Sequence, residues 1–194
     1  MDAKTVDAGE IRLVEMKVDD LGTVARWLAE PHVSRWYVAG SSVEREIDDL
    51  RQSVAGEQAV HALMVIYGSD PVGWCQWYLC HDDPEWAKDI GAEPGDVGID
   101  YAIGSPAHHS QGIGTKMIAE LVDAVRVVHP GSSILADPDE KNTASRRVLE
   151  KNGFRLLAVK PIPSEPTDDP MAVYRLRPGP AVSASGRSTR DRSR

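Results

Sequence analysis

Residues 97–128 read VGIDYAIGSPAHHSQGIGTKMIAELVDAVRVV and predict, in order, a strand, a turn and a helix. The strand covers Val97–Ile103 and ends at a Gly-Ser-Pro segment, a composition typical of turns. Small residues then form a turn over 108–114 that leads directly into the helix. The helix carries one broad apolar stripe, which consists of Met117, Ile118, Leu121, Val122, Val125 and Val128.

The turn between this strand and this helix has the chemistry of an anion site. Helix N-termini present free N–H groups and favour negative charge, and Gly112 and Gly114 let a phosphate approach the backbone closely. The hydroxyl of Thr115 can add a hydrogen bond. The order of a Walker P-loop is absent, and a dinucleotide fingerprint fits poorly because the turn comes late in the chain, after a hairpin. A Gly-x-Gly turn alone is weak evidence, since many such turns only start helices.

The hydrophobic periodicity of the sequence also predicts helices and strands before and after residues 97–128. We predict helices that begin at Asp19 or Asp20 and run to Leu28, and over 43–54 and 142–151. Segment 81–95 is predicted to be an acidic loop, and 32–37 a short aromatic segment after Pro31. Predicted strands cover 11–16, 59–67, 72–80, 132–136, 154–159 and 171–176, with a hairpin turn over 68–71. This order predicts an α/β fold with a mixed sheet and helices on both faces.

The 194 residues are predicted to form a single domain over 1–178 and a disordered Ser/Arg-rich tail over 179–194. The chain carries a net charge of −8, and the tail, with four arginines and one aspartate, leaves −11 on the rest. An acidic body argues against a nucleic-acid partner. Either solubility or a cationic substrate accounts for this charge, and composition does not choose between them.

The chain has no apolar run near the ~18 residues of a membrane helix and no secretory signal at its start, so we expect no membrane association and a cytoplasmic location. Cys75 and Cys80 lie in one predicted strand, where packed side chains are a more common role than an acyl-thioester intermediate. His108 and His109 lack a third ligand at matching spacing, so we expect no metal.

A second motif complements the turn at 111–115, QGIGT. About 30 residues later, Asn142-Thr143-Ala144 opens a helix that ends EKNGF at Phe154. This pairing resembles the GNAT superfamily of acetyl-coenzyme A-dependent N-acetyltransferases. The resemblance implies the GNAT-type acyl-CoA N-acyltransferase fold, with a mostly antiparallel sheet. It further implies that the turn holds the pyrophosphate of coenzyme A, and that parallel strands at 97–103 and 132–136 splay apart to admit the pantetheine arm.

A narrower resemblance covers residues 10–177. The segments at 71–78, 98–100, 112–116, 137–138 and 172–174 are similar to those of the aminoglycoside 6′-N-acetyltransferases. The resemblance implies an acidic cleft that binds a polycationic aminosugar antibiotic, and direct acetyl transfer to its 6′-amine in a ternary complex. We expect a monomer or a homodimer.

The resemblance also implies the site residues. Asp100 matches the carboxylate proposed as general base. Substrate contacts are implied for Trp36, Tyr37, Gln76, Tyr78, Glu85, Trp86, Asp137 and either Asp168 or Asp169. Contacts with acetyl-CoA are implied for Tyr101, Ile103, His109, Gln111, Gly112, Ile113, Gly114, Thr115 and Asn142. Gln76 and Tyr78 point to one face because they are two residues apart on a strand.

Three positions depart from the family pattern. His109 stands where relatives usually have Gln or Arg, and it can still donate a hydrogen bond. Leu149 stands where many relatives have a tyrosine that protonates the departing thiolate, and leucine has no proton to give. The loop at 81–95 keeps one aromatic, Trp86, of the two that the family has.

Several alternatives remain open from the sequence. Asp100 could cap a loop at a strand end, and Asp137 could simply begin a turn with Pro138. The acceptor could be another amine, such as a polyamine, a siderophore lysine or a protein N-terminus. A non-catalytic acyl-CoA-binding sensor is a different class of function that the Leu149 departure keeps open.

Overall fold

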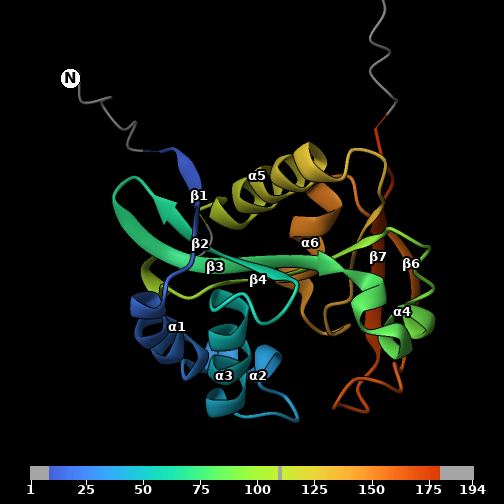
Figure 1. Cartoon of the computed structure of the whole chain (residues 1–194), viewed down its shortest axis with the longest axis horizontal. Coiled ribbons are helices and arrows are strands. Elements are labelled where there is room, and N and C mark those ends of the chain that lie inside the picture. Colours follow the sequence, from blue (N-terminus) through green and yellow to red (C-terminus); the bar gives the residue numbers. More distant parts are fainter. Residues whose placement is uncertain (1–8, 109–110, 180–194) are drawn as a thin grey trace, which may run out of the picture.

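The computed structural model describes residues 9–108 and 111–179 and contains one seven-stranded sheet in the order β1-β2-β3-β4-β5-β7-β6 (Figure 1). The strands are β1 Ile11–Glu15, β2 Val60–Tyr67, β3 Asp70–Leu79, β4 Val97–Ile103, β5 Ile134–Ala136, β6 Arg155–Lys160 and β7 Met171–Leu176. The helices are α1 Leu21–Leu28, α2 Pro31–Tyr37, α3 Val43–Val54, α4 Pro84–Ile90, α5 Ile113–Val128 and α6 Thr143–Lys151. Figure 1 shows α5 and α6 on one face of the sheet and α1, α2 and α3 on the other.

The predicted mixed α/β fold is therefore confirmed, with antiparallel pairing everywhere except between β4 and β5. The predicted hairpin is β2–β3, and its turn is shorter than expected because Tyr67 already pairs with Asp70. Gly68 has φ of +62°, a left-handed conformation that glycine adopts without strain.

The parallel strands β4 and β5 stay together only at their beginnings. Val97 pairs with Ile134 and Gly98 with Leu135, and no further register is formed between these two described strands. The buried side chain of Asp96 accepts a hydrogen bond of 3.3 Å from the N–H of Ser133, which holds the paired end closed. Beyond Gly98 the strands separate, as the resemblance implied.

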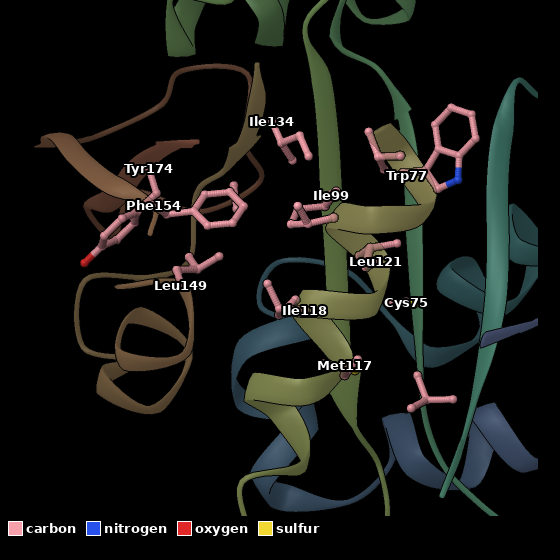
Figure 2. Packing of buried hydrophobic residues seen from close by; sticks show 14 of the residues in the cluster. Cys75, Trp77, Ile99, Met117, Ile118, Leu121, Ile134, Leu149, Phe154 and Tyr174 are labelled. Atoms are coloured by element: carbon pink, nitrogen blue, oxygen red, sulfur yellow. The ribbon is translucent and has the colours of Figure 1, made fainter. Parts of the chain in front are cut away.

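The main core lies between α5 and the sheet (Figure 2). Met117, Ile118 and Leu121 of α5 are at most 1% exposed. They pack with Cys75, Trp77 and Ile99 of the central strands, and Figure 2 shows Leu149, Phe154 and Tyr174 extending the same cluster. The helix stripe read from the sequence thus forms the buried face, although Val128 at the helix end is 58% exposed.

A second core lies under α1 and α3 on the opposite face. Trp27 stacks on Trp74 with ring centroids 6.2 Å apart, and both side chains belong to this second cluster. A Cβ on Gly104, directly after β4, would lie 2.1 Å from the Trp27 ring. Glycine there lets the end of β4 pass beneath α1.

Two segments differ from the sequence expectations. The predicted loop at 81–95 contains a 3₁₀ turn, Cys80–Asp82, and the helix α4. The Asp83 carboxylate caps α4 by accepting the N–H groups of Glu85 and Trp86, and Gly91 ends it at φ of +72°. The prediction of a loop was wrong because these acidic residues serve as a cap and a solvent face around a buried Trp86.

The start of the first helix also differs. The Asp20 side chain accepts the N–H of Lys17 and so closes the preceding 3₁₀ turn, Val18–Asp20, instead of capping α1. Pro31 is the first residue of α2, a position where a missing N–H costs nothing. Within 9–108 and 111–179, no helix is both long and apolar enough to cross a membrane. The predicted tail lies outside the described residues except for Gly179.

Candidate active site

A cavity of about 460 Å³ opens where β4 and β5 separate. Side chains from both faces of the sheet line it. Gln76 is the register partner of Asp100, and both point to the face of α2 and α3. Tyr101, the next residue of β4, points to the opposite face, where its hydroxyl meets Ser145 of α6. The cavity therefore passes between the strands and connects the two faces.

Asp100 lies where the two strands diverge. Its Oδ2 accepts a hydrogen bond of 2.9 Å from Nε2 of Gln76. Burial raises the pKa of Asp100 above its ordinary value, and hydrogen bonds from Gln76 and Tyr78 partly oppose this shift. A carboxylate with a raised pKa, reached from the cavity, is a better proton acceptor than a free one.

Asp137 directly follows β5 and faces the same cavity. The indole Nε1 of Trp86 donates a hydrogen bond of 3.1 Å to its Oδ2. Burial, reinforced by the negative charges of Glu165 and Asp100, raises the pKa of Asp137 to about 7. A Cβ on Gly98 would lie 2.5 Å from the Tyr78 ring and 2.9 Å from that of Trp86, so glycine makes room for both rings.

The cavity is strongly acidic. Two arginines, Arg35 and Arg45, line it together with six carboxylates: Glu46, Asp49, Asp100, Asp137, Asp139 and Glu165. The predicted aromatic pair Trp36 and Tyr37 also lines it. This wall matches a cationic ligand, because positive charge would offset the excess of carboxylates and favour their ionised forms.

Glu165 is a cavity residue that the sequence analysis missed. Burial and the nearby carboxylates, Asp100 first among them, raise its pKa to about 7. The segment that carries it is held by two contacts: Ser164 bonds to the Asp89 carboxylate of α4, and Pro166 lies against Gly40. A Cβ on Gly40 would lie 2.3 Å from the Pro166 carbonyl oxygen. The segment PSEPTDDP at 163–170 contains no periodicity that could have revealed which acid turns inward.

The late acids that were predicted lie elsewhere. Asp168 is exposed and is not among the cavity-lining residues. Asp169 forms an ion pair of 2.9 Å with Lys141 on the exposed rim. Glu85 is exposed and also outside the cavity wall, while Trp86 reaches the site through its hydrogen bond to Asp137.

The glycine-bearing turn retains an open approach to the backbone. Gly112 is the N-cap of α5 with φ of +77°, and an added Cβ would meet nothing within 4 Å. The first-turn N–H groups of α5 are the donors that an anion such as the pyrophosphate of coenzyme A requires, so this turn fits that group. Thr115 donates its N–H to the Gly112 carbonyl, and Gln111 donates to that of Ala107.

Two other turn residues serve packing. A Cβ on Gly114 would lie 3.3 Å from Cγ2 of Val148, so Gly114 lets α6 approach α5. The side chain of Ile113 is 1% exposed and belongs to the core, so only its backbone can face a ligand. The predicted contact at His109 lies outside the described residues.

Of the remaining predicted cofactor residues, Tyr101 and Asn142 line the cavity and Ile103 does not. Asn142 lines it and caps α6 by accepting the Ser145 N–H at 3.1 Å. The N–H of Val97 donates to Ser133 on the β5 side, so by alternation the main-chain groups of Tyr101 and Ile103 face the gap. The Ile103 carbonyl lies 3.3 Å from Nε2 of His32.

Both cysteines are buried, unpaired thiols. Burial raises the pKa of each, so neither has the thiolate character of a nucleophile. Among the residues that the structure describes, no group of three or more His, Cys, Asp or Glu side chains could hold a metal ion.

Comparisons with known proteins agree with this geometry. Residues 17–159 match the family described as Acetyltransferase (GNAT) domain. The chain is 26% identical over 177 residues to the aminoglycoside N(6′)-acetyltransferase type 1 of Klebsiella pneumoniae, covering 88% of this chain and 83% of that protein. It is also 26% identical over 166 residues to the lysine N-acyltransferase MbtK of Mycobacterium tuberculosis strain H37Rv, covering 82% and 74%.

Solved structures share the fold. The aminoglycoside acetyltransferase AAC(6′)-Ib in complex with coenzyme A and kanamycin superimposes with a TM-score of 0.74 at 24% identity. The match covers 87% of this chain and 95% of that one.

Proposed function

Since the chain belongs to the GNAT acetyltransferase family, we propose that it transfers the acetyl group of acetyl-coenzyme A to the 6′-amine of an aminoglycoside antibiotic. The observation that carries this proposal is the wall of six carboxylates around the gap between β4 and β5. Relatives at 26% identity include an aminoglycoside N(6′)-acetyltransferase, which supports the same acceptor.

The charge and size of the cavity suit this acceptor. An aminoglycoside is a small polycation, and its ammonium groups can be matched by several carboxylates at once. A volume of about 460 Å³ lies within the range of small-molecule sites, roughly 300–1,000 Å³. Trp36 and Tyr37 add flat surfaces on which sugar rings can pack.

The chain's own residues can hold and deprotonate the reacting amine. An alkyl amine with a pKa near ~10.4 arrives protonated and cannot attack until it loses that proton. Asp100 can accept the proton, directly or through a water, while Asp137 and Glu165 hold other ammonium groups. The main-chain N–H groups of Tyr101 and Ile103 face the gap, and either can stabilise an oxyanion.

Acetyl-coenzyme A, when bound, supplies the activated acetyl group as a thioester. The residues that would hold it are the first turn of α5, from Gly112 to Thr115, and the gap-facing backbone of Tyr101 and Ile103. Asn142 at the start of α6 lines the same passage.

The second candidate acceptor is a lysine side chain, because the lysine N-acyltransferase MbtK is equally distant, at 26% identity. A lysine amine brings one positive charge to the cavity, whereas the carboxylates there outnumber the arginines by four. The several positive charges of an aminoglycoside therefore balance the negative charge of the cavity wall more completely than one lysine amine does.

A thiol-release assay with acetyl-coenzyme A against kanamycin, spermidine, lysine and a short peptide tests the proposal. We expect the highest kcat/KM for kanamycin, with a KM that rises steeply with salt, because charges are screened over ~8–10 Å near physiological ionic strength. Faster turnover of lysine or the peptide, or a KM for kanamycin that does not respond to salt, would overturn the aminoglycoside assignment.

A further inference from the structure

Acetyl transfer, the proposed function on which this inference rests, leaves a negatively charged sulfur that must gain a proton. Leu149 cannot provide it. Its side chain is fully buried in the core under α6, where Figure 2 shows it beside Phe154 and Tyr174. Water can supply the proton, and so can another protein group that reaches the passage between β4 and β5.

A pair of hydroxyls lies on the α6 side of that passage. The Oη of Tyr101 and the Oγ of Ser145 are 2.6 Å apart, and both residues line the cavity. Ser145 precedes Leu149 by four residues, so it lies one helical turn away on the same face of α6. The pair therefore places an O–H group on the face of α6 that carries Leu149, one turn nearer the start of the helix.

The two faces of β4 separate an acid from a base. Asp100 and Tyr101 are consecutive, so their side chains point to opposite faces of the sheet. The carboxylate of Asp100 lies on the side of Gln76 and the acidic wall, where a cationic amine would enter. The Tyr101 hydroxyl lies on the side of α5 and α6, the side of the glycine-bearing turn. A proton acceptor for the nucleophile and a proton donor for the leaving group each assist acyl transfer, and this strand offers one on each face.

We propose that Tyr101, hydrogen-bonded to Ser145, donates the proton to the departing sulfur. Asp100 first takes one proton from the ammonium group and passes it to solvent, which leaves a neutral amine. The amine lone pair then forms the C–N bond to the acetyl carbon, the C–S bond breaks, and its electron pair goes to sulfur. Sulfur takes the Tyr101 proton, and Asp100 takes the amine proton. Solvent restores the tyrosine proton through Ser145 and removes the proton from Asp100, so one amide and one thiol form without any oxidant.

The protonation state of Tyr101 agrees with this role. Burial raises the pKa of its hydroxyl above the ordinary value, and the hydrogen bond to Ser145 opposes this shift in part. The group therefore carries its proton at neutral pH. Burial also makes it a weaker acid, and the hydrogen bond with Ser145 opposes this by stabilising the phenolate that donation leaves.

The test compares Tyr101→Phe with the wild type in two measurements. The first is kcat with whichever amine of the acceptor panel reacts fastest, and we expect a loss of about 10²-fold, the lower end for removal of a general acid. The second is the pKa of the thiol of bound coenzyme A, followed by thiolate absorbance in a pH titration. Losing a donor to the thiolate should raise that pKa by about one unit.

Tyr174→Phe is the matched control. It removes another tyrosine hydroxyl that contacts α6, through Arg146 and Glu150, and lies outside the cavity wall. We expect it to lower the melting temperature and leave the thiol pKa unchanged. An unchanged kcat in Tyr101→Phe, or a reduced kcat with the thiol pKa at its wild-type value, would overturn the proposed donor. The two proposals can fail separately. The acceptor panel tests whether kanamycin is the substrate, whereas the thiol titration tests Tyr101 and needs no acceptor.

Discussion

The indole N–H of Trp86 donates a hydrogen bond of 3.1 Å to the carboxylate of Asp137, across 51 residues of sequence. Trp86 comes from α4 and is 6% exposed, while Asp137 directly follows the short strand β5. The bond ties α4 to the acidic wall and supports the charged form of a carboxylate whose pKa burial raises to about 7.

Replacing Trp86 by phenylalanine should weaken aminoglycoside binding. The variant keeps an aromatic ring near Gly98 and Tyr78 but loses the donor, so the pKa of Asp137 rises further and less of it is charged at pH 7. We expect KM for kanamycin to rise by about fivefold with little change in kcat, as for a net hydrogen bond of about 1 kcal/mol. Trp77→Phe, in the core against α5, is the control and should leave KM unchanged. Equal KM values in both variants would contradict the role of the bond.

Replacing Asp100 by asparagine should chiefly lower turnover. The variant can still hydrogen-bond to Gln76, but it lacks a proton acceptor. We expect kcat to fall by about 10²–10⁴-fold while acetyl-coenzyme A affinity hardly changes. Steady-state kinetics up to pH 9 check this, because a deprotonated amine needs less help from a base. The exposed Asp70→Asn is the control. A defect confined to KM would show that Asp100 only anchors an ammonium group.

Aminoglycoside affinity should increase from pH 6 to pH 8. The pKa values of Asp137 and Glu165 are both raised to about 7, so both carboxyls gain negative charge over this interval while the antibiotic stays largely cationic. We expect the dissociation constant of kanamycin, measured by calorimetry, to fall by about tenfold, equivalent to about 1.4 kcal/mol. Glu165→Gln should flatten the pH profile. An affinity that is constant over this interval in the wild type would argue against cation binding by these two acids.

The same raised pKa makes Asp137 a destabilising group at high pH. An unfolded aspartate has a pKa of about 3.9, so between pH 4 and 7 the folded state holds a proton that the unfolded state has lost. The free energy of unfolding therefore falls as pH rises through this interval. Asp137→Asn should have a higher melting temperature than the wild type at pH 8, and the difference should shrink as the pH falls and nearly vanish below about pH 4, where both states are protonated, by differential scanning calorimetry. The reverse order at pH 8 would mean that Asp137 is charged and satisfied in the folded protein.

Substitution of Gly112 should weaken coenzyme A binding. Asparagine tolerates the left-handed conformation at φ of +77°, so Gly112→Asn adds a side chain to the open approach without breaking the turn. Gly56→Asn is a matched control, since Gly56 has φ of +74° and also open space around it. We expect coenzyme A affinity, by calorimetry, to fall by about tenfold or more in the first variant alone. Equal affinities would place the pyrophosphate elsewhere.

Local sequence was enough for most of the elements and for the mixed sheet. The apolar stripe at 117–125, the strands around Gly68 and the helix stop at Gly153 each follow from periodicity or turn chemistry within a few residues. The family resemblance then supplied what periodicity lacks, namely the separation of β4 and β5 and the places of Asp100 and Asp137. The structure bears out that separation and puts both carboxylates in one cavity.

Tertiary structure alone decided which of many acids face the cavity. Glu165 turns inward and Asp169 pairs with Lys141 because of how the segment before β7 packs on Gly40 and Asp89, residues more than 70 positions away in the sequence. The same holds for α4. The helix is too short to give a periodic signal, and its Trp86 is hydrogen-bonded to Asp137, which is 51 residues away in the sequence. The burial of these side chains and the charge around them depend on how distant segments pack together. No local sequence pattern could therefore have predicted them.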